Sequence, residues 1–438
     1  MLRLNVDALK GRIAACDGFR IVGKLRSARG VLTARMPGRV GDVCLIRLAD
    51  EVTLPAEVIG FEGDTVQIMP FRPCEGAEPG CRVIDLRRPY RVPVGERLLG
   101  RVINGLGHPL DDRGALNCND WRHIHNVTPS ALQRPRVAEP FVTGQRVIDG
   151  LLTCGRGQRV GLFAGSGVGK STLLGEIARH AVSDVNIIVL VGERGREVRP
   201  FLEDCLGEEG LRRSVVVVAT ADETPLMRVR AVSTGIAIAD HFRRAGRQVL
   251  FLLDSLTRMA TAQREIGLAR GEPPTSRGYT PSVFSLIAST LESLGNSETG
   301  SITGILTVLV DGDDFDEPIT DSARSVLDGH VVLSRKLAEK GQFPAVDVGA
   351  SISRVFRDVT TIAHQTAARK VRSILATYEE VADLIQIGAY QKGSVPRIDR
   401  AVELLPKVHD FLKQPAGTTS PWTETQQRLS KVAEAWPW

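Results

Sequence analysis

The sequence lacks the features of a membrane-spanning or secreted protein. In its 438 residues, the longest apolar runs, such as Val215 to Val218 and Ile302 to Val310, fall short of the roughly 18 to 20 residues that a helix needs to cross a bilayer. The first stretch, Met1 to Ala15, carries charges throughout and has no uninterrupted apolar centre of a secretory signal. We therefore expect a cytoplasmic protein. The same stretch has apolar residues near one face of a possible short helix, which fits either a docking segment or a frayed end.

The sequence also lacks a metal-binding or disulfide pattern of cysteines. Seven cysteines occur, an odd number with no C-x-x-C pair, so reduced thiols are expected. The net charge of +5 includes no block of five or more like charges, so it permits contact with nucleic acid or acidic lipid without indicating either. Aromatic residues make up only 5% of the chain, which disfavours the base-stacking surface of a nucleic-acid translocase.

The length and the spacing of apolar segments predict three domains. From Gly18 to about Leu86, short apolar segments separated by Gly, Pro and Asp predict a small all-β sandwich or barrel. The stretch Arg87 to Val94, rich in Pro and Arg, is interpreted as its exit linker. These features place an N-terminal β-rich domain at residues 1–94.

From about Gln158, apolar β-rich runs alternate with helical periodicity. Continuous apolar strands that alternate with helices predict an α/β fold with a mostly parallel sheet covered on both faces. After Ala363 the pattern becomes helical. We assign a central domain to residues 95–363 and a helical C-terminal domain to residues 364–438. The predicted strands are Arg159–Phe163, Asn186–Val191, Ser214–Thr220, Gln248–Leu253, Ile302–Val310 and His330–Ser334.

The segment Ala164 to Ser171 has the P-loop pattern, between a predicted strand and a predicted helix. Its glycines allow backbone N–H groups to turn toward phosphate oxygens, and the N-terminus of the following helix favours an anion. Lys170 would reach the β- and γ-phosphates, and the Ser171 hydroxyl would bind Mg²⁺. The pattern begins with Gly, where this chain has Ala164, which is small enough to fit. The expected nucleotide-binding residues are Gly165, Ser166, Gly167, Val168, Gly169, Lys170, Ser171 and Thr172.

Two carboxylates complete the chemistry expected of a P-loop ATPase. Asp254 ends an apolar strand, where a P-loop enzyme places the acidic group that holds Mg²⁺. Glu193 follows another strand and is a candidate to position and deprotonate water. Spacing alone does not distinguish Glu193 from a solvated loop charge.

Several segments in order resemble one family. Residues 161–171, 191–197 and 254–258 resemble the type III secretion ATPases, relatives of the catalytic β subunit of rotary ATP synthases. Pro344 to Asp347, followed by Ser351 to Arg354, is similar to the α/β-subunit signature of that superfamily. The resemblance implies a RecA-like core between a β-barrel and a helical domain, and a homohexamer with ATP at each subunit interface.

The resemblance also implies residue roles. Glu193 becomes the general base, and Arg354 an arginine finger donated across the subunit interface. Phe343 matches an aromatic residue that packs against adenine, although ordinary core packing explains it as well. The expected catalytic residues are Lys170, Glu193 and Arg354. Ser171 and Asp254 are expected to hold Mg²⁺.

Within the family, Ala262 to Leu268 and Gly271 to Tyr279 resemble the flagellum-specific branch more than the injectisome branch. The resemblance then implies a cytoplasmic ATPase of a flagellar export apparatus, peripherally associated with the inner membrane. Its expected partners are regulator and stalk-like proteins, chaperone–substrate complexes and a membrane export gate, with no sequence-specific nucleic acid. Three alternatives remain: an injectisome ATPase, an RNA-translocating ring ATPase, and a non-catalytic nucleotide-binding subunit. Glu193 and Arg354 together argue against the last.

Overall fold

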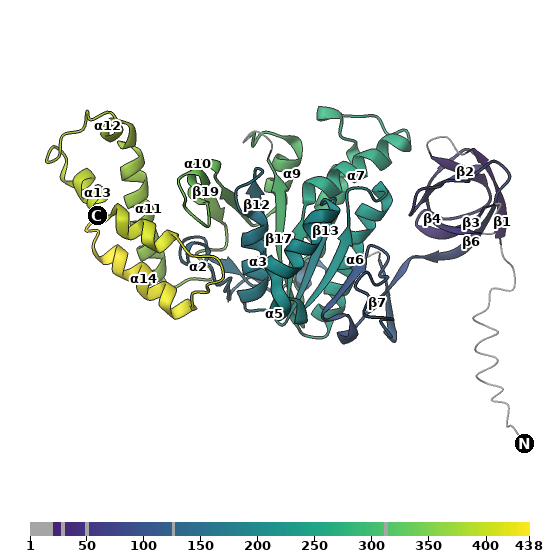
Figure 1. Cartoon of the computed structure of the whole chain (residues 1–438), viewed down its shortest axis with the longest axis horizontal. Coiled ribbons are helices and arrows are strands. Elements are labelled where there is room, and N and C mark those ends of the chain that lie inside the picture. Colours follow the sequence, from purple (N-terminus) through teal and green to yellow (C-terminus); the bar gives the residue numbers. More distant parts are fainter. Residues whose placement is uncertain (1–20, 28–30, 49–51, 125–127, 311–313) are drawn as a thin grey trace, which may run out of the picture. The chain divides into compact units, whose positions relative to one another are not determined.

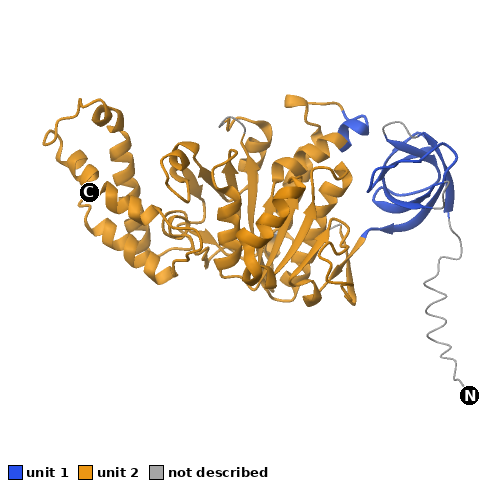
Figure 2. Cartoon of the chain, viewed as in Figure 1, with its two compact units in different colours: residues 1–90, 266–272 blue, residues 91–265, 273–438 orange. Residues whose placement is uncertain are grey.

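The chain divides into two compact units, residues 1–90 with 266–272 and residues 91–265 with 273–438 (Figure 2). Among the described residues, none of the helices has the length and apolarity needed to cross a bilayer. The possible helix at residues 1–15 lies outside the described part. The structure is a computed structural model that describes residues 21–27, 31–48, 52–124, 128–310 and 314–438 (Figure 1).

The N-terminal strands close into an antiparallel barrel, so the predicted β-rich domain is confirmed as a barrel. The strand order is β1-β2-β5-β4-β3-β6. Alternate residues point inward, as in β2, where Leu32 and Ala34 are buried in the barrel core. The strands are β1 (Ile21–Ser27), β2 (Leu32–Arg35), β3 (Asp42–Arg47), β4 (Thr53–Glu62), β5 (Thr65–Pro70) and β6 (Arg82–Pro89).

The predicted exit linker at Arg87 to Val94 is wrong. The barrel strand β6 continues to Pro89, and β7 (Arg91–Val94) pairs with β9 (Asp120–His123) in a separate two-stranded sheet. The prolines suggested an irregular linker, but proline is tolerated at a strand end and in edge strands, where its missing N–H breaks no central ladder.

The second unit is built on a large sheet of order β19-β18-β12-β17-β15-β13-β14-β8, with β16 paired to β17. The strands from β18 to β8 run parallel, and β19 is antiparallel to β18. All six predicted strands are present, whereas β8, β16 and β19 were not predicted. The strands are β8 (Arg101–Asn104), β12 (Arg159–Ala164), β13 (Val185–Val191), β14 (Ser214–Ala219), β15 (Gln248–Asp254), β16 (Gly295–Asn296), β17 (Ser301–Leu309), β18 (Gly329–Leu333) and β19 (Val346–Ser353).

Helices cover both faces of this sheet because its central strands are apolar throughout. In β13, Ile187 and Val189 face helix α6 (Pro225–Arg244), where Gly235 allows the close approach. The alternate residues Ile188 and Leu190 join the cluster that contains Leu173 of helix α3 (Lys170–His180). The helix that follows the P-loop is therefore anchored on one face of the sheet.

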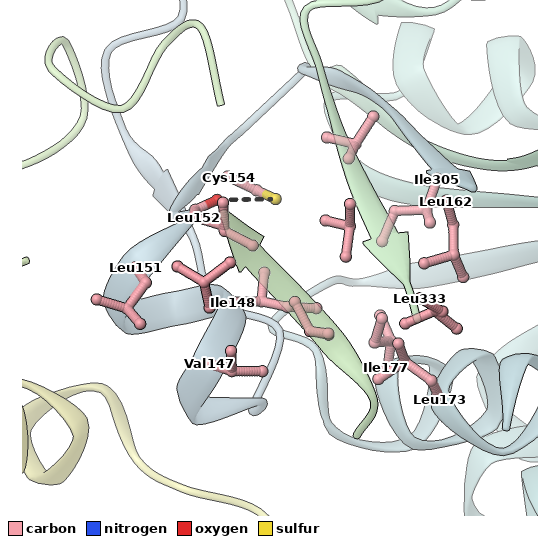
Figure 3. Close-up of a cluster of buried hydrophobic side chains, with 14 of the residues drawn as sticks. Val147, Ile148, Leu151, Leu152, Cys154, Leu162, Leu173, Ile177, Ile305 and Leu333 are labelled. Atoms are coloured by element: carbon pink, nitrogen blue, oxygen red, sulfur yellow. Dashed lines mark hydrogen bonds between the residues drawn. The ribbon is translucent and has the colours of Figure 1, made fainter. Parts of the chain in front are cut away.

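The core beneath α3 is drawn in Figure 3. Leu173 and Ile177 of α3 lie near Leu162 of β12, Ile305 of β17 and Leu333 of β18. The thiol of Cys154 is buried in the same cluster, with its sulfur 3.8 Å from the Leu152 carbonyl oxygen. Burial of these side chains fixes the start of α3, and hence the P-loop, on the sheet.

Helix α6 begins at an identifiable sequence signal. In α6, Thr224 caps the first turn by accepting a hydrogen bond from the Met227 N–H at 3.3 Å, and Pro225 occupies the first turn. The other elements of this region are α2 (Arg146–Leu151), α4 (Gly195–Pro200), α5 (Gly207–Arg212), α7 (Leu256–Ala269), α8 (Pro281–Ser293), α9 (Pro318–Val326), α10 (Arg335–Glu339), the π-helical turn η3 (Phe201–Leu206), the 3₁₀ turns η1 (Glu96–Leu98), η2 (Ala131–Gln133) and η4 (Ser276–Gly278), and the short strands β10 (Pro140–Phe141) and β11 (Cys154–Gly155).

The predicted helical C-terminal domain is confirmed. Helix α11 packs against α13 and α14. Leu404, Val408 and Phe411 lie along one face of α13 and join the same core cluster as the fully buried Trp436. The helices are α11 (Ile362–Glu379), α12 (Ala382–Gln386), α13 (Pro396–Leu412) and α14 (Trp422–Glu434).

We expect Trp436→Ala to lower the free energy of unfolding by about 3–5 kcal/mol, because it removes a buried aromatic side chain and leaves a cavity. The matched control is Trp438→Ala, since Trp438 is 51% exposed although its ring lies 5.0 Å from that of Trp436. Denaturant unfolding followed by circular dichroism measures both variants. Equal losses for the two tryptophans would contradict the packing described for α13 and α14.

Candidate active site

The P-loop joins the end of β12 to the start of α3. Gly167 and Gly169 have positive φ angles of 80° and 85°, a conformation that favours glycine. Ser166 and Gly167 are exposed, as are Ser171 and Thr172 in the first turn of α3. The loop thus presents backbone N–H groups and the helix N-terminus to the same open side, as an anion site requires.

Lys170 is the meeting point of the charged groups. Its ammonium forms an ion pair with Asp254 and lies 3.5 Å from Oε1 of Glu193. Asp254 is the last residue of β15, and Glu193 follows β13. These strands are adjacent and parallel, so the two side chains meet at one edge of the sheet. The structure therefore brings together three of the residues selected from the sequence.

Asp254 is also held by a neighbour that the sequence analysis missed. The hydroxyl of Thr307 on β17 donates a hydrogen bond of 2.7 Å to Oδ1 of Asp254. β17 lies between β12 and β15, so this contact follows from the strand order rather than from any motif. Both side chains are buried, which fixes the orientation of the carboxylate.

Glu193 lies in an environment that favours its neutral form. Burial raises its pKa to about 7, and the negative charge of Asp254 and a hydrogen bond with Glu197 also raise it, whereas the cations of Lys170 and Arg258 lower it. Arg258 lies 3.5 Å from Oε2 of Glu193, a pairing also missed from the sequence. Such a carboxyl titrates near neutral pH, which suits a group that accepts a proton during turnover.

A pocket of about 450 Å³, here called the Glu193 pocket, is lined by Ser171, Glu193, Asp254, Phe201 and Cys205 among others. Oε1 of Glu193 is buried there and has no hydrogen-bond partner among the described residues. One hydroxyl and one carboxylate at the phosphate end of the P-loop fit Mg²⁺, which takes few protein ligands and completes its shell with waters and substrate phosphates. These residues could hold the ion together with bound ATP.

A second pocket of about 510 Å³, the Phe343 pocket, is lined by other residues of the P-loop and of α3. The ring of Phe343 is 48% exposed and lies 3.5 Å from the position that a Cβ of Gly169 would occupy. Val168 and Thr172 line the pocket from the P-loop side, and Pro415 lines it from the segment between α13 and α14. An exposed aromatic ring beside the phosphate loop can stack on a nucleobase.

Comparison with known proteins accounts for most of the chain. Residues 144–353 match the nucleotide-binding domain of the ATP synthase alpha/beta family, residues 30–87 its beta-barrel domain, and residues 360–431 the C-terminal domain of the type III secretion ATPase EscN. The flagellum-specific ATP synthase of Bacillus subtilis is 48% identical over 95% of this chain and 96% of that protein.

The chain belongs to the family of flagellar and type III secretion ATPases. The type 3 secretion system ATPase of Xanthomonas euvesicatoria is 47% identical over 94% of this chain and 93% of that protein. The assembled EscN ATPase of enteropathogenic E. coli has a TM-score of 0.89 at 42% identity, over 94% of this chain and 100% of that one. In complex with its central stalk EscO, EscN gives a TM-score of 0.87. The resemblance stated from the motifs is confirmed, and this ATPase is an ATP hydrolase.

Arg354 of this ATPase lies outside the cluster around Lys170. It follows β19, is exposed, and donates a hydrogen bond of 3.2 Å to the Arg324 carbonyl oxygen. Among the described residues, no ion pair or hydrogen bond joins Arg354 to Lys170, Glu193 or Asp254. The remaining site residues named from the sequence lie in the P-loop or in the two pockets.

We expect kcat/KM for ATP to rise as the pH is raised through about 7, because Glu193 must be ionised to accept a proton and its pKa is raised to about 7. Glu193→Gln should lower kcat by about 10²–10⁴-fold and remove this step from the pH profile. Steady-state hydrolysis between acid and alkaline pH measures both. Glu203→Gln, at an exposed carboxylate on η3, is the control. A step that persists in Glu193→Gln would contradict the assignment of Glu193 as the base.

Phe343→Ala should raise KM for ATP by about tenfold with little change in kcat, since base–aromatic stacking is worth about 1–3 kcal/mol. Phe61→Ala, at a 53% exposed aromatic residue of the barrel, is the matched control. Hydrolysis at varied ATP concentration gives both constants. An unchanged KM would mean that Phe343 does not contact the base.

Proposed function

We propose that this ATPase powers a flagellar-type protein export apparatus by hydrolysing Mg-ATP at the subunit interfaces of a homohexameric ring. The proposal rests on the positions of the charged site residues within one chain. Lys170, Asp254 and Glu193 meet at the P-loop, whereas Arg354 is exposed and contacts none of them. A second copy that donates Arg354 would complete the site.

In this proposal each group has a distinct role in phosphoryl transfer. The P-loop N–H groups and Lys170 bind the β- and γ-phosphates, and Asp254 and Ser171 hold Mg²⁺. Glu193 orients the attacking water and accepts its proton. Arg354 from the neighbouring subunit neutralises charge on the transferring phosphoryl group. When bound, Mg²⁺ would supply Lewis-acid stabilisation of the same charge.

The ring and the export role are supported by relatives. EscN is described as an assembled ATPase and as a complex with a central stalk, so we infer a ring with a stalk-like partner here as well. Chaperone–substrate complexes, a regulator and an export gate follow from the resemblance, as does peripheral association with the inner membrane. We propose the domain limits 1–94, 95–363 and 364–438 for the three working parts.

The flagellar branch is favoured by the segments Ala262 to Leu268 and Gly271 to Tyr279. Overall identity does not separate the branches, because a flagellar and an injectisome relative are 48% and 47% identical to this chain. Deletion of the gene, followed by measurement of secreted filament protein, tests the role. Filament export at the normal rate in the deletion strain would overturn the flagellar assignment.

The shared site predicts complementation between two inactive variants. Lys170→Ala cannot bind the phosphates and Arg354→Ala cannot stabilise the transition state, so each alone should lose about 10³-fold or more in turnover. Mixed rings contain interfaces in which an intact P-loop meets an intact Arg354, so mixing should restore ATPase activity. The mixture of Lys170→Ala with the double variant Lys170→Ala/Arg354→Ala is the control and should stay inactive. Activity that does not return on mixing would contradict a site shared between subunits.

A further inference from the structure

Glu176 is a buried charged side chain on α3 that the proposed chemistry does not use. It is only 4% exposed and lines the Phe343 pocket. It lies six residues beyond Lys170 along α3, and among the described residues it has no hydrogen bond or ion pair with the P-loop. A carboxylate in such a position needs strong partners to offset its desolvation.

The partners of Glu176 tie α3 to the segment Lys413–Ser420, which we call the connector. Oε1 accepts a hydrogen bond of 2.9 Å from the backbone N–H of Gly417 and forms an ion pair with Arg179. Oε2 lies 3.4 Å from Nε2 of His180 and makes no hydrogen bond with any described residue. Gly417 has a φ of 78°, a conformation that favours glycine.

Within the described part of the chain, the other hydrogen bonds that join the connector to the rest of the protein lie near its ends. Gln414 donates its N–H to the Phe343 carbonyl oxygen and its side-chain amide to the Gly144 carbonyl oxygen, both at 2.9 Å. The N–H of Ser420 donates to the same Gly144 oxygen at 3.1 Å. Bonds from Thr418 to Pro415 and from Gln414 to Thr418 shape the turn but remain inside the connector. Among the described contacts, Glu176 is thus the side chain that fixes the middle of the connector to α3.

This contact matters because the Phe343 pocket is assembled from separate segments. Thr172 and Leu173 belong to α3, Phe343 precedes β19, and Pro415 and Ala416 belong to the connector. The bond between the Gly417 N–H and Glu176 holds the middle of the connector beside α3. A charge-assisted bond to a buried carboxylate is among the stronger restraints available for this purpose.

We propose that Glu176 is a positioning residue that sets the nucleoside end of the ATP site by fixing the connector to the P-loop helix. The inference rests on the proposed binding of ATP at the P-loop. It adds that affinity for the base and ribose depends on Glu176, whereas affinity for the phosphates does not, since the P-loop anchors them separately.

The test compares ATP with inorganic tripolyphosphate, which has the phosphates but no nucleoside. KM for ATP and the inhibition constant of tripolyphosphate are measured for the wild type, Glu176→Ala, Glu176→Gln and the control Glu208→Gln, an exposed carboxylate on α5. We expect Glu176→Ala to raise KM for ATP about tenfold, equivalent to about 1.4 kcal/mol, with kcat and the tripolyphosphate constant unchanged. Glu176→Gln keeps an acceptor for the Gly417 N–H and should give a smaller rise.

Thermal unfolding of each variant distinguishes a local effect on the pocket from a loss of global stability. If Glu176→Ala fails to fold, Glu176→Gln, which retains the size of the side chain, is used in its place. An unchanged KM in Glu176→Ala, or a parallel rise in KM and in the tripolyphosphate constant, would overturn the role of Glu176. A wild-type protein that neither hydrolyses ATP nor binds tripolyphosphate would instead overturn the proposed function on which the inference rests.

Discussion

The ammonium group of Lys170 holds two carboxylates, Asp254 and Glu193, at the edge of the sheet where parallel strands end. Like charges at this separation repel, and burial makes the repulsion stronger. The positive charge of Lys170 therefore offsets the repulsion between the two buried carboxylates. Arg258 adds a second cation beside Oε2 of Glu193. When Mg-ATP binds, the phosphates would replace the carboxylates as partners of Lys170, and the metal would supply the positive charge beside the carboxylates.

The fold provides the constraint that keeps these groups together. β12, β15 and β13 are parallel and apolar, so helices must cover both faces and the loops must gather at the carboxyl edge. α3 is anchored by Leu173 and Ile177 in a core that continues into the helical domain. The connector of that domain lines the Phe343 pocket together with α3, so in the proposed site the nucleoside would lie between two parts of the chain that are distant in sequence.

The features that could be predicted from the sequence are those encoded locally. The P-loop is a contiguous strand-loop-helix segment, and the long apolar strands have a clear pattern, so both were predicted with their residues. β8 was missed because four residues carry too little periodicity, and β7 was taken for a linker because of its prolines. The contacts of Thr307 with Asp254, of Arg258 with Glu193 and of Gly417 with Glu176 depend on strand order and on distant segments. No local pattern could reveal them.

In the proposed ring, one copy of this chain carries the phosphate-binding half of a site that a second copy completes. The most direct test is ATP turnover per subunit, measured from dilute to concentrated protein and followed in parallel by light scattering. We expect turnover per subunit to rise with concentration as oligomers form and then to reach a plateau. A substantial rate that stays constant down to concentrations at which the protein is a monomer would contradict a site shared between two copies.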